Sequence, residues 1–181
     1  MIKGYFQLLI KHYGDILTDV SVGMLFVYCV GTILLLAFLG WKKGAKWSAG
    51  LLLAEYLVLL LILSVWARTV MAERKFDFTP FWSYRAILAG RKDLLTQDIM
   101  NVAAFIPIGL LLPCAFGRLK WWQALLIGGV FSVLIEALQF VLMRGFAEFD
   151  DVFHNVLGCI IGYEVYVGMA FLLKCIEHRK I

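Results

Sequence analysis

The chain has 181 residues, of which 62% are hydrophobic and 17% are charged, whereas soluble domains average roughly 45–50% apolar residues. Too few charged side chains remain to cover a compact particle in water, so this composition excludes a water-soluble globular protein and favours a membrane protein. The net charge is +4. Membrane topology explains the placement of the lysines and arginines, and we expect no nucleic-acid partner.

The first 19 residues place apolar side chains at helical spacing between frequent charges. This pattern predicts a short helix that lies in the membrane interface, with a solvated helical lead-in as the alternative. A small-residue cleavage site is missing before the first long apolar segment, so we expect no cleavable signal peptide.

Five apolar segments follow, and a hydrocarbon core of about 30 Å needs about 20 helical residues to cross it. We expect spans near residues 20–39, 47–66, 100–116, 121–143 and 152–173. The third is shorter, and its Pro107 and Pro113 predict a kink or a tilt. The sequence therefore predicts an all-α, polytopic membrane bundle that forms a single domain over residues 1–181.

Lysine and arginine are dense in three short flanks, which five spans place on one side of the membrane: 41–46, 117–120 and 174–181. The other side holds the amino-terminal segment and a long connection of about residues 67–99. Because dense basic flanks stay in the cytoplasm, we expect the amino terminus and this connection to lie outside. Aromatic residues between 76 and 84 suit headgroup depth, so the connection is expected to associate with the membrane.

The four cysteines lie within or at the end of apolar segments: Cys29, Cys114, Cys159 and Cys175. They form no CxxC pair and have no histidine at metal-ligand spacing, so we interpret them as small hydrophobic residues and expect no cofactor.

Small residues predict where the helices approach one another. Gly158 and Gly162 form a GxxxG pair in the last span, which favours close contact with a neighbouring helix. Gly109, Gly128 and Gly129 are candidates for the facing surfaces.

Polar side chains gather at one end of the predicted bundle. Ser132, Glu136 and Gln139 follow one another at spacings of four and three, so they share a helix face, and the next connection and helix start read RGFAEFDDVFHN. Polar groups at membrane depth are costly and usually mark a site or an internal partner. The candidate ligand-binding residues are Asn101, Glu136, Gln139, Arg144, Asp150, Asp151 and Asn155.

One arginine cannot neutralise three carboxylates in and beside a membrane, so this cluster predicts a ligand or a bound proton. Arg144 follows the fourth span directly and is expected to fold back onto Glu136. The alternative is purely structural, with Arg144 neutralising buried carboxylates and Asn155 linking helices. Glu55 and Glu164 lie deeper without polar neighbours at helical spacing, and we rank them lower.

Three motifs occur in order between Asn101 and about Tyr166. They read N-x3-F-x-P-x-G-x3-P from Asn101, S-x3-E-x2-Q from Ser132 and R-x-F-x3-D-D-x3-N-x2-G-x3-G from Arg144. In this respect the chain resembles the VanZ-like family of bacterial membrane proteins, over about residues 76–175. It departs from the family at 145–148, where relatives usually carry a small polar, an aromatic, an aspartate and an apolar residue.

The resemblance implies a multi-pass protein of the bacterial plasma membrane. The family's namesake is associated with low-level resistance to teicoplanin, a lipid-bearing glycopeptide that acts outside the cell. We therefore expect recognition of an envelope lipid headgroup or an amphiphilic glycopeptide at the outer face, with a homo-oligomer left open. Arg144 would bind phosphate or carboxylate, and the acidic residues would bind a divalent cation or ligand amines.

Two other classes of function stay open. An intramembrane hydrolase or transferase would use Asp150, Asp151 or Glu136 as general base, with His154 or Arg144 stabilising charge. A small proton-coupled transporter or flippase would use Glu136 and Glu164 as protonatable positions. The sequence shows neither a nucleophile with its base nor an established metal motif, so it does not decide whether a reaction is catalysed.

Overall fold

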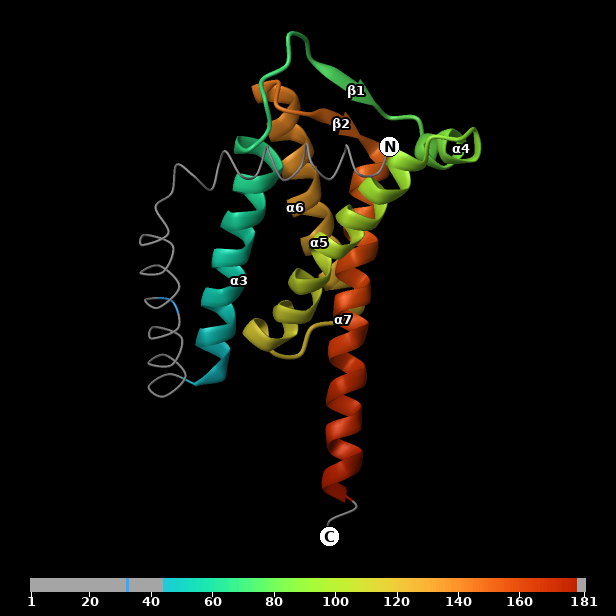
Figure 1. The fold of residues 1–181 in the computed structure, drawn as a ribbon. Coiled ribbons are helices and arrows are strands. Elements are labelled where there is room, and N and C mark those ends of the chain that lie inside the picture. The colour runs from blue at the N-terminus through green and yellow to red at the C-terminus, as the bar shows by residue number, and fades with distance from the viewer. Residues whose placement is uncertain (1–31, 33–43, 179–181) are drawn as a thin grey trace.

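The structure is a computed structural model, and it describes residue 32 and residues 44–178. Long helices form a bundle, and two short strands cover one end of it (Figure 1). In chain order the elements are α3 (Ala45–Leu61), a π-helical turn (Ile62–Trp66), β1 (Lys75–Asp77), α4 (Trp82–Leu88), α5 (Lys92–Phe116), α6 (Trp121–Leu142), β2 (Phe146–Glu148) and α7 (Phe149–His178).

Four of the described helical segments are long and apolar enough to cross a membrane: Ala45–Trp66, Lys92–Phe116, Trp121–Leu142 and Phe149–His178. The all-α class and the expected spans at 47–66, 121–143 and 152–173 are thereby confirmed. The interfacial helix expected at 1–19 lies outside the described residues, as does the span expected at 20–39 except for Thr32.

Helix α5 begins at Lys92 and not, as expected, near Met100. The segment Lys92–Ile99 carries several charges, which made it look like part of the connection. Its Leu94 and Asp98 are nevertheless buried, and their spacing of four places them on one helix face. The connection that precedes α5 is therefore shorter than predicted, and both prolines lie inside the helix.

Glycines allow α5 and α7 to pack backbone against backbone. A Cβ on Gly158 or Gly162 would collide with carbonyl oxygens of α5, and a Cβ on Gly109 would collide with the carbonyl group of Cys159. Close packing at the GxxxG pair is thus confirmed, with Gly109 on the facing surface.

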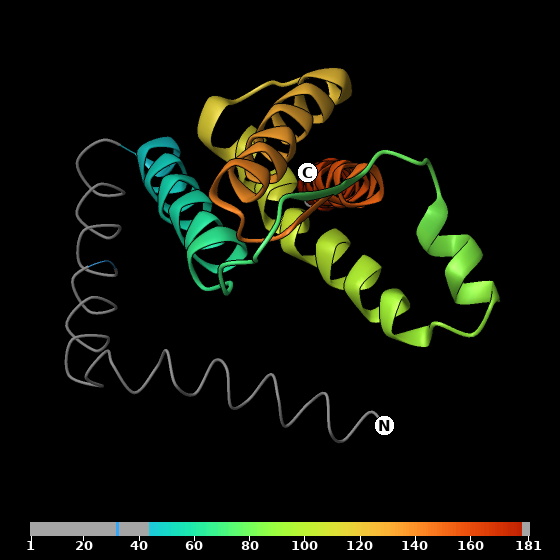
Figure 2. The ribbon, with the colours of Figure 1, turned by 90° about the horizontal axis from the view of Figure 1, so that it is seen from above.

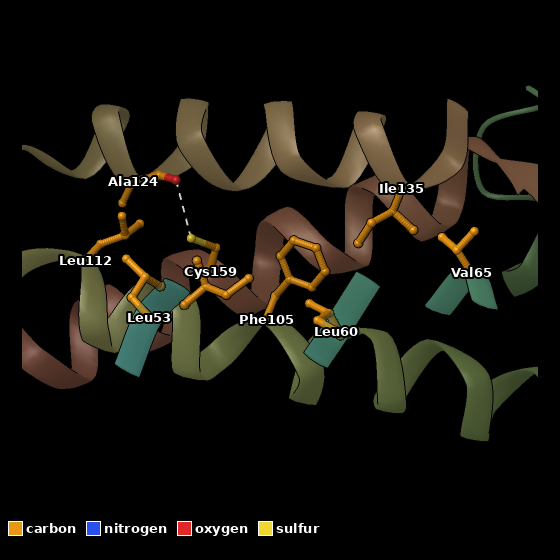
Figure 3. Close-up of a cluster of buried hydrophobic side chains, with 9 residues drawn as sticks. Leu53, Leu60, Val65, Phe105, Leu112, Ala124, Ile135 and Cys159 are labelled. Carbon is orange, nitrogen blue, oxygen red and sulfur yellow. Dashed lines mark hydrogen bonds between the residues drawn. The ribbon is translucent and has the colours of Figure 1, made fainter. Parts of the chain in front are cut away.

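A hydrophobic core joins α3, α5, α6 and α7 (Figure 3). Cys159 lies within it and donates a hydrogen bond from Sγ to the carbonyl of Ala124 at 3.3 Å. Gly128 makes room for this thiol, because a Cβ there would lie 2.8 Å from Sγ, whereas Gly129 has ordinary space. The core side chains are Leu53, Leu60, Val65, Phe105, Ile108, Leu112, Ala124, Ile135 and Cys159.

The segment between α3 and α4 crosses over the ends of the helices (Figure 2). Here β1 pairs in parallel with β2, with Lys75 opposite Phe146 and Asp77 opposite Glu148. At the other end of the bundle, a Cβ on Gly117 would lie 3.3 Å from Nζ of Lys46. The start of α3 and the α5–α6 connection therefore share one end, which agrees with the expected grouping of the basic flanks.

Candidate functional site

Five of the seven predicted ligand-binding residues meet around one internal cavity of about 20 Å³. This volume has room for about one water molecule. The cavity is lined by residues of α3, the π-helical turn, α5, α6 and α7. The five residues are Asn101, Glu136, Gln139, Asp151 and Asn155.

Two polar atoms in the wall of this cavity are buried without a hydrogen-bond partner among the described residues. They are Nδ2 of Asn101 and Oε1 of Gln139. The opposite end of the Gln139 amide is fixed, because Nε2 donates to the carbonyl of Ser64 at 3.0 Å. Since an unsatisfied buried polar group costs about 1–3 kcal/mol, the cavity offers one donor and one acceptor to a small polar guest.

Arg68 also lines the cavity, and sequence reasoning missed it. Its guanidinium interacts electrostatically with the carboxylates of Glu136 and Asp151. The position of this arginine directly after an apolar span was a usable signal, because a cation there can reach inward beside the helix ends.

Arg144 lies elsewhere, and the expectation that it folds back onto Glu136 is wrong. Its Nη1 donates to the carbonyls of Trp66 at 2.8 Å and Arg68 at 2.9 Å, and no ion pair joins it to a carboxylate within residues 44–178. The carbonyls at the carboxyl end of a helix carry partial negative charge and attract cations. Arg144 therefore caps the end of the first described span.

Glu136 is held by the backbone of β2, because its Oε2 accepts the N–H of Glu148 at 3.0 Å. The two residues are only 7% and 6% exposed. Glu148 lies outside the spanning helices, and burial raises its pKa to about 8, with the nearby charge of Asp151 adding to the effect. Sequence reasoning counted Glu148 in the polar segment RGFAEFDDVFHN and in the departure from the family pattern, but did not select it as a ligand-binding residue.

The same two glutamates also line an open groove of about 600 Å³, whose exposed wall is almost entirely apolar. The groove runs between α6 and the start of α7, beneath aromatic side chains of the connection that contains β1. Its wall is otherwise apolar, and it is lined by Phe76, Phe78, Val133, Glu136, Ala137, Phe140, Ala147, Glu148, Phe149 and Val152. Glu136 thus faces both this groove and the internal cavity.

Asp150 has a structural position apart from the cavity. It is fully buried, and its carboxylate accepts the N–H groups of Phe81 at 2.6 Å and Ser83 at 2.9 Å. These are unpaired donors at the start of α4, and Phe81 has a left-handed backbone with φ of 59°. Asp150 therefore fixes the aromatic connection to the start of α7.

His154 links α4 and α5 to α7. Its Nε2 lies 2.8 Å from Oη of Tyr84, and its Nδ1 lies 3.6 Å from Oδ1 of Asp98. Burial raises the pKa of Tyr84, and the negative charges of Asp98 and Asp150 raise it further. The phenol therefore keeps its proton, which suits an anchor better than a nucleophile.

The remaining polar contacts join neighbouring helices. Asn155 donates from Nδ2 to Oγ of Ser132 at 2.9 Å, and both residues are buried. Asp151 accepts a longer hydrogen bond of 3.4 Å from Nε2 of Gln97. These contacts hold the carboxylate and amide groups of the cavity in fixed positions.

Comparison with known proteins decides the family. A family model described as VanZ/LLP1 matches residues 26–173 of the chain. The chain belongs to the VanZ/LLP1 family. It is also 33% identical over 70 residues to Protein VanZ of Enterococcus faecium, a match that covers 39% of this chain and 44% of that protein. The chain thus matches less than half the length of this curated relative, and no solved structure matches it.

Membership of the VanZ/LLP1 family and four spanning helices make the chain a multi-pass protein of the bacterial plasma membrane. The internal cavity and the groove both lie within the matched residues. Among residues 44–178, no three His, Cys, Asp or Glu side chains lie close enough together to hold a metal ion.

The two lower-ranked glutamates of this VanZ/LLP1 protein lie apart from the cavity. Glu55 of α3 accepts a hydrogen bond from Oγ1 of Thr32 at 3.3 Å. Glu164 is exposed on α7, and it lines neither the groove nor the internal cavity.

Proposed function

We propose that the protein binds an amphiphile of the cell envelope, either a lipid or a lipid-bearing glycopeptide, at the outer face of the plasma membrane. The groove carries this proposal. Its volume of about 600 Å³ falls within the usual range of about 300–1,000 Å³ for small-molecule sites, which are mostly apolar with a few placed polar groups.

The groove matches the apolar part of an amphiphile. Phe76, Phe78 and Phe140 offer apolar contacts, and almost the whole exposed wall of the groove is apolar. A lipid chain gains about 0.8 kcal/mol for each methylene that it buries, and the polar head would extend out of the groove. The dense basic flanks at the opposite end support an outward-facing groove.

Binding at this position supports a role in low-level resistance to teicoplanin-type glycopeptides. A protein that holds the acyl chain of such a compound, or the lipid beside which it inserts, lowers the amount that reaches its target. The family resemblance and the groove both favour this role over catalysis.

A groove-filling substitution tests the proposal. Ala137 lies in the wall of the groove. The larger side chain of Ala137→Trp should fill the groove and abolish binding of a fluorescent acyl probe to the protein in nanodiscs. Ala103 is exposed on α5 and lies outside the groove, so Ala103→Trp is the matched control and should bind like the unaltered protein.

The same pair is then expressed in a teicoplanin-susceptible bacterium. The unaltered protein and Ala103→Trp should raise the minimum inhibitory concentration, and Ala137→Trp should not. If Ala137→Trp still binds the probe and still raises the minimum inhibitory concentration, the groove is not the binding site.

A further inference from the structure

A second hollow lies at the strand-covered end of the bundle and is separate from the groove. It is an open surface cleft of about 320 Å³, lined by Arg68, Thr69, Met71, Arg144, Gly145 and Phe146. None of these residues lines the groove. The side chains of the cleft include two guanidinium groups and one hydroxyl group, and no acidic residue lines it. The cleft therefore offers hydrogen-bond donors and positive charge to an anion.

Arg144 is held in place and still has donors to offer. Its Nη1 donates to the carbonyls of Trp66 and Arg68, which fixes the plane of the guanidinium group. A guanidinium group has five N–H donors, and these two bonds use only those of Nη1. Within residues 44–178, Nε and Nη2 of Arg144 make no hydrogen bond. These two nitrogens can donate side by side to two oxygens of one anion.

Arg68 brings the second guanidinium group to the cleft. Its Nη1 lies beside Gly145 in the cleft wall, where a Cβ would be 2.9 Å away. The carboxylates of Glu136 and Asp151 interact with it electrostatically, but no ion pair joins Arg68 to either within the described part of the chain. Both carboxylates line the internal cavity and not the cleft. The N–H donors of Arg68 are therefore not committed to an ion pair.

The cleft lies at the depth where lipid headgroups are expected. Trp66 ends a segment that is long and apolar enough to span a membrane, and Arg68 of the cleft follows two residues later. The same connection continues to Arg74 and Lys75, so that residues 67–75 contain three basic residues and one acidic residue. Basic residues directly beside a spanning helix attract anionic headgroups.

We propose that this cleft binds a phosphate group, with Nε and Nη2 of Arg144 donating to two of its oxygens and Arg68 and Thr69 donating to the others. A phosphate group suits the cleft because its several oxygens accept from two guanidinium groups at once, whereas the two oxygens of a carboxylate are occupied by one. The phosphate belongs either to a membrane lipid or to a soluble compound. The site does not depend on the amphiphile groove, because the two hollows share no lining residue.

Two lipids with identical acyl chains test the proposal: dioleoyl phosphatidate has a phosphate head, and dioleoylglycerol has none. Native mass spectrometry measures the binding of each lipid to the purified protein in detergent. Phosphatidate should bind at a concentration about tenfold lower than dioleoylglycerol, as expected for two basic residues beside one anionic head. Glycerol 3-phosphate has the head without the acyl chains, and as a competitor it identifies the source of the phosphate.

Variants assign the preference to the cleft. Thr69→Glu places a carboxylate at an exposed position of the cleft and leaves both arginines in place. It should reduce the preference for phosphatidate to about threefold or less, because like charges repel. Thr79→Glu, at an exposed position outside the cleft, is the matched control and should keep the full preference. Arg144→Lys keeps the charge, loses the planar pair of donors and should also weaken the preference. If Arg144→Lys does not fold, Thr69→Glu decides.

The outcomes separate this site from the groove. Ala137→Trp fills the groove and should keep the preference for phosphatidate, so its loss in this variant would place the phosphate in the groove and overturn the cleft. Equal binding of the two lipids to the unaltered protein, or a preference that survives Thr69→Glu, would overturn it as well. Displacement of phosphatidate by glycerol 3-phosphate would identify a soluble compound as the source, and persistence of phosphatidate would identify a lipid headgroup.

Discussion

Arg68 passes so close to Gly145 that a Cβ at position 145 would lie 2.9 Å from its Nη1 and equally close to Oε1 of Gln139. The arginine lines two spaces at once, the internal cavity and an open surface cleft of about 320 Å³ that Arg144 also lines. Because Gly145 has no side chain, the guanidinium of Arg68 has room to approach the carboxylates of Glu136 on α6 and Asp151 on α7.

Gly145→Ala should displace the Arg68 side chain and lower the free energy of unfolding by about 1–3 kcal/mol, the usual effect of overpacking. Thermal unfolding of the purified protein in detergent measures this loss. Gly168→Ala is the matched control, because no atom lies within 4 Å of a Cβ at that position and alanine favours a helix by about 1 kcal/mol over glycine. Equal losses at the two positions would contradict the close approach.

Glu136 should be energetically coupled to Arg68 and not to Arg144. In a double-mutant cycle, Glu136→Gln and Arg68→Gln should show an interaction energy of about 0.5–3 kcal/mol, because the two residues share one cavity. Glu136→Gln and Arg144→Gln should be additive within about 0.5 kcal/mol. The reverse pattern, measured by unfolding in detergent, would restore Arg144 as the partner of Glu136.

Glu148 should make stability depend on pH. Its pKa is raised from 4.5 to about 8 by burial, so between these two pH values the folded protein binds this proton more tightly than the unfolded chain does. The free energy of unfolding should therefore fall as pH rises from about 4.5 to about 8, by up to about 1.4 kcal/mol for each pH unit, and then level off.

Glu148→Gln should flatten this decline, whereas Glu73→Gln, at an exposed position, should retain it. Unfolding midpoints at pH 5, 6.5 and 8 make the comparison. An unchanged slope in Glu148→Gln would show that the carboxyl group is ionised throughout this range.

Gly162→Leu should prevent the contact between α5 and α7, because even a Cβ collides with the backbone of α5 at this position. The yield of monodisperse protein in detergent should fall sharply, and Gly168→Leu, which has open space, should have little effect. Similar yields for the two variants would mean that α7 faces lipid at Gly162.

The orientation is tested by cysteine labelling in intact cells. A membrane-impermeant reagent should label a cysteine placed at Thr79, beside β1, and should not label one placed at Gly44, before α3. This follows from the dense basic flanks at the Gly44 end. Labelling only at Gly44 would place the groove on the cytoplasmic side.

The sequence predicted the helices and their contacts because these features depend on short spacings. The apolar lengths located three of the described spans, and the GxxxG spacing located the contact at Gly158 and Gly162. Five cavity residues were also found. Glu136 and Gln139 share a helix face because of their spacing of three, and the others were expected where neighbouring helices start on the same side of the membrane.

What could not be predicted depends on contacts between segments far apart in the chain. Arg68 reaches Glu136 because the end of the first described span packs against α6. Glu148 is buried because β1 pairs with its strand, and a three-residue strand leaves no recognisable pattern. Arg144 was assigned to Glu136 because it directly follows the span that carries this glutamate, while its partners are carbonyls at the end of the first described span.

The parallel pairing of β1 with β2 has a consequence for how the protein is assembled in the bilayer. Helices α5 and α6 separate the two strands in the chain, so the ribbon closes only after both helices have been inserted. Contacts between distant segments form late, since the loop between them must be ordered first. The roof of the groove is thus among the last parts to form, and a chain interrupted before β2 would contain spanning helices but no groove.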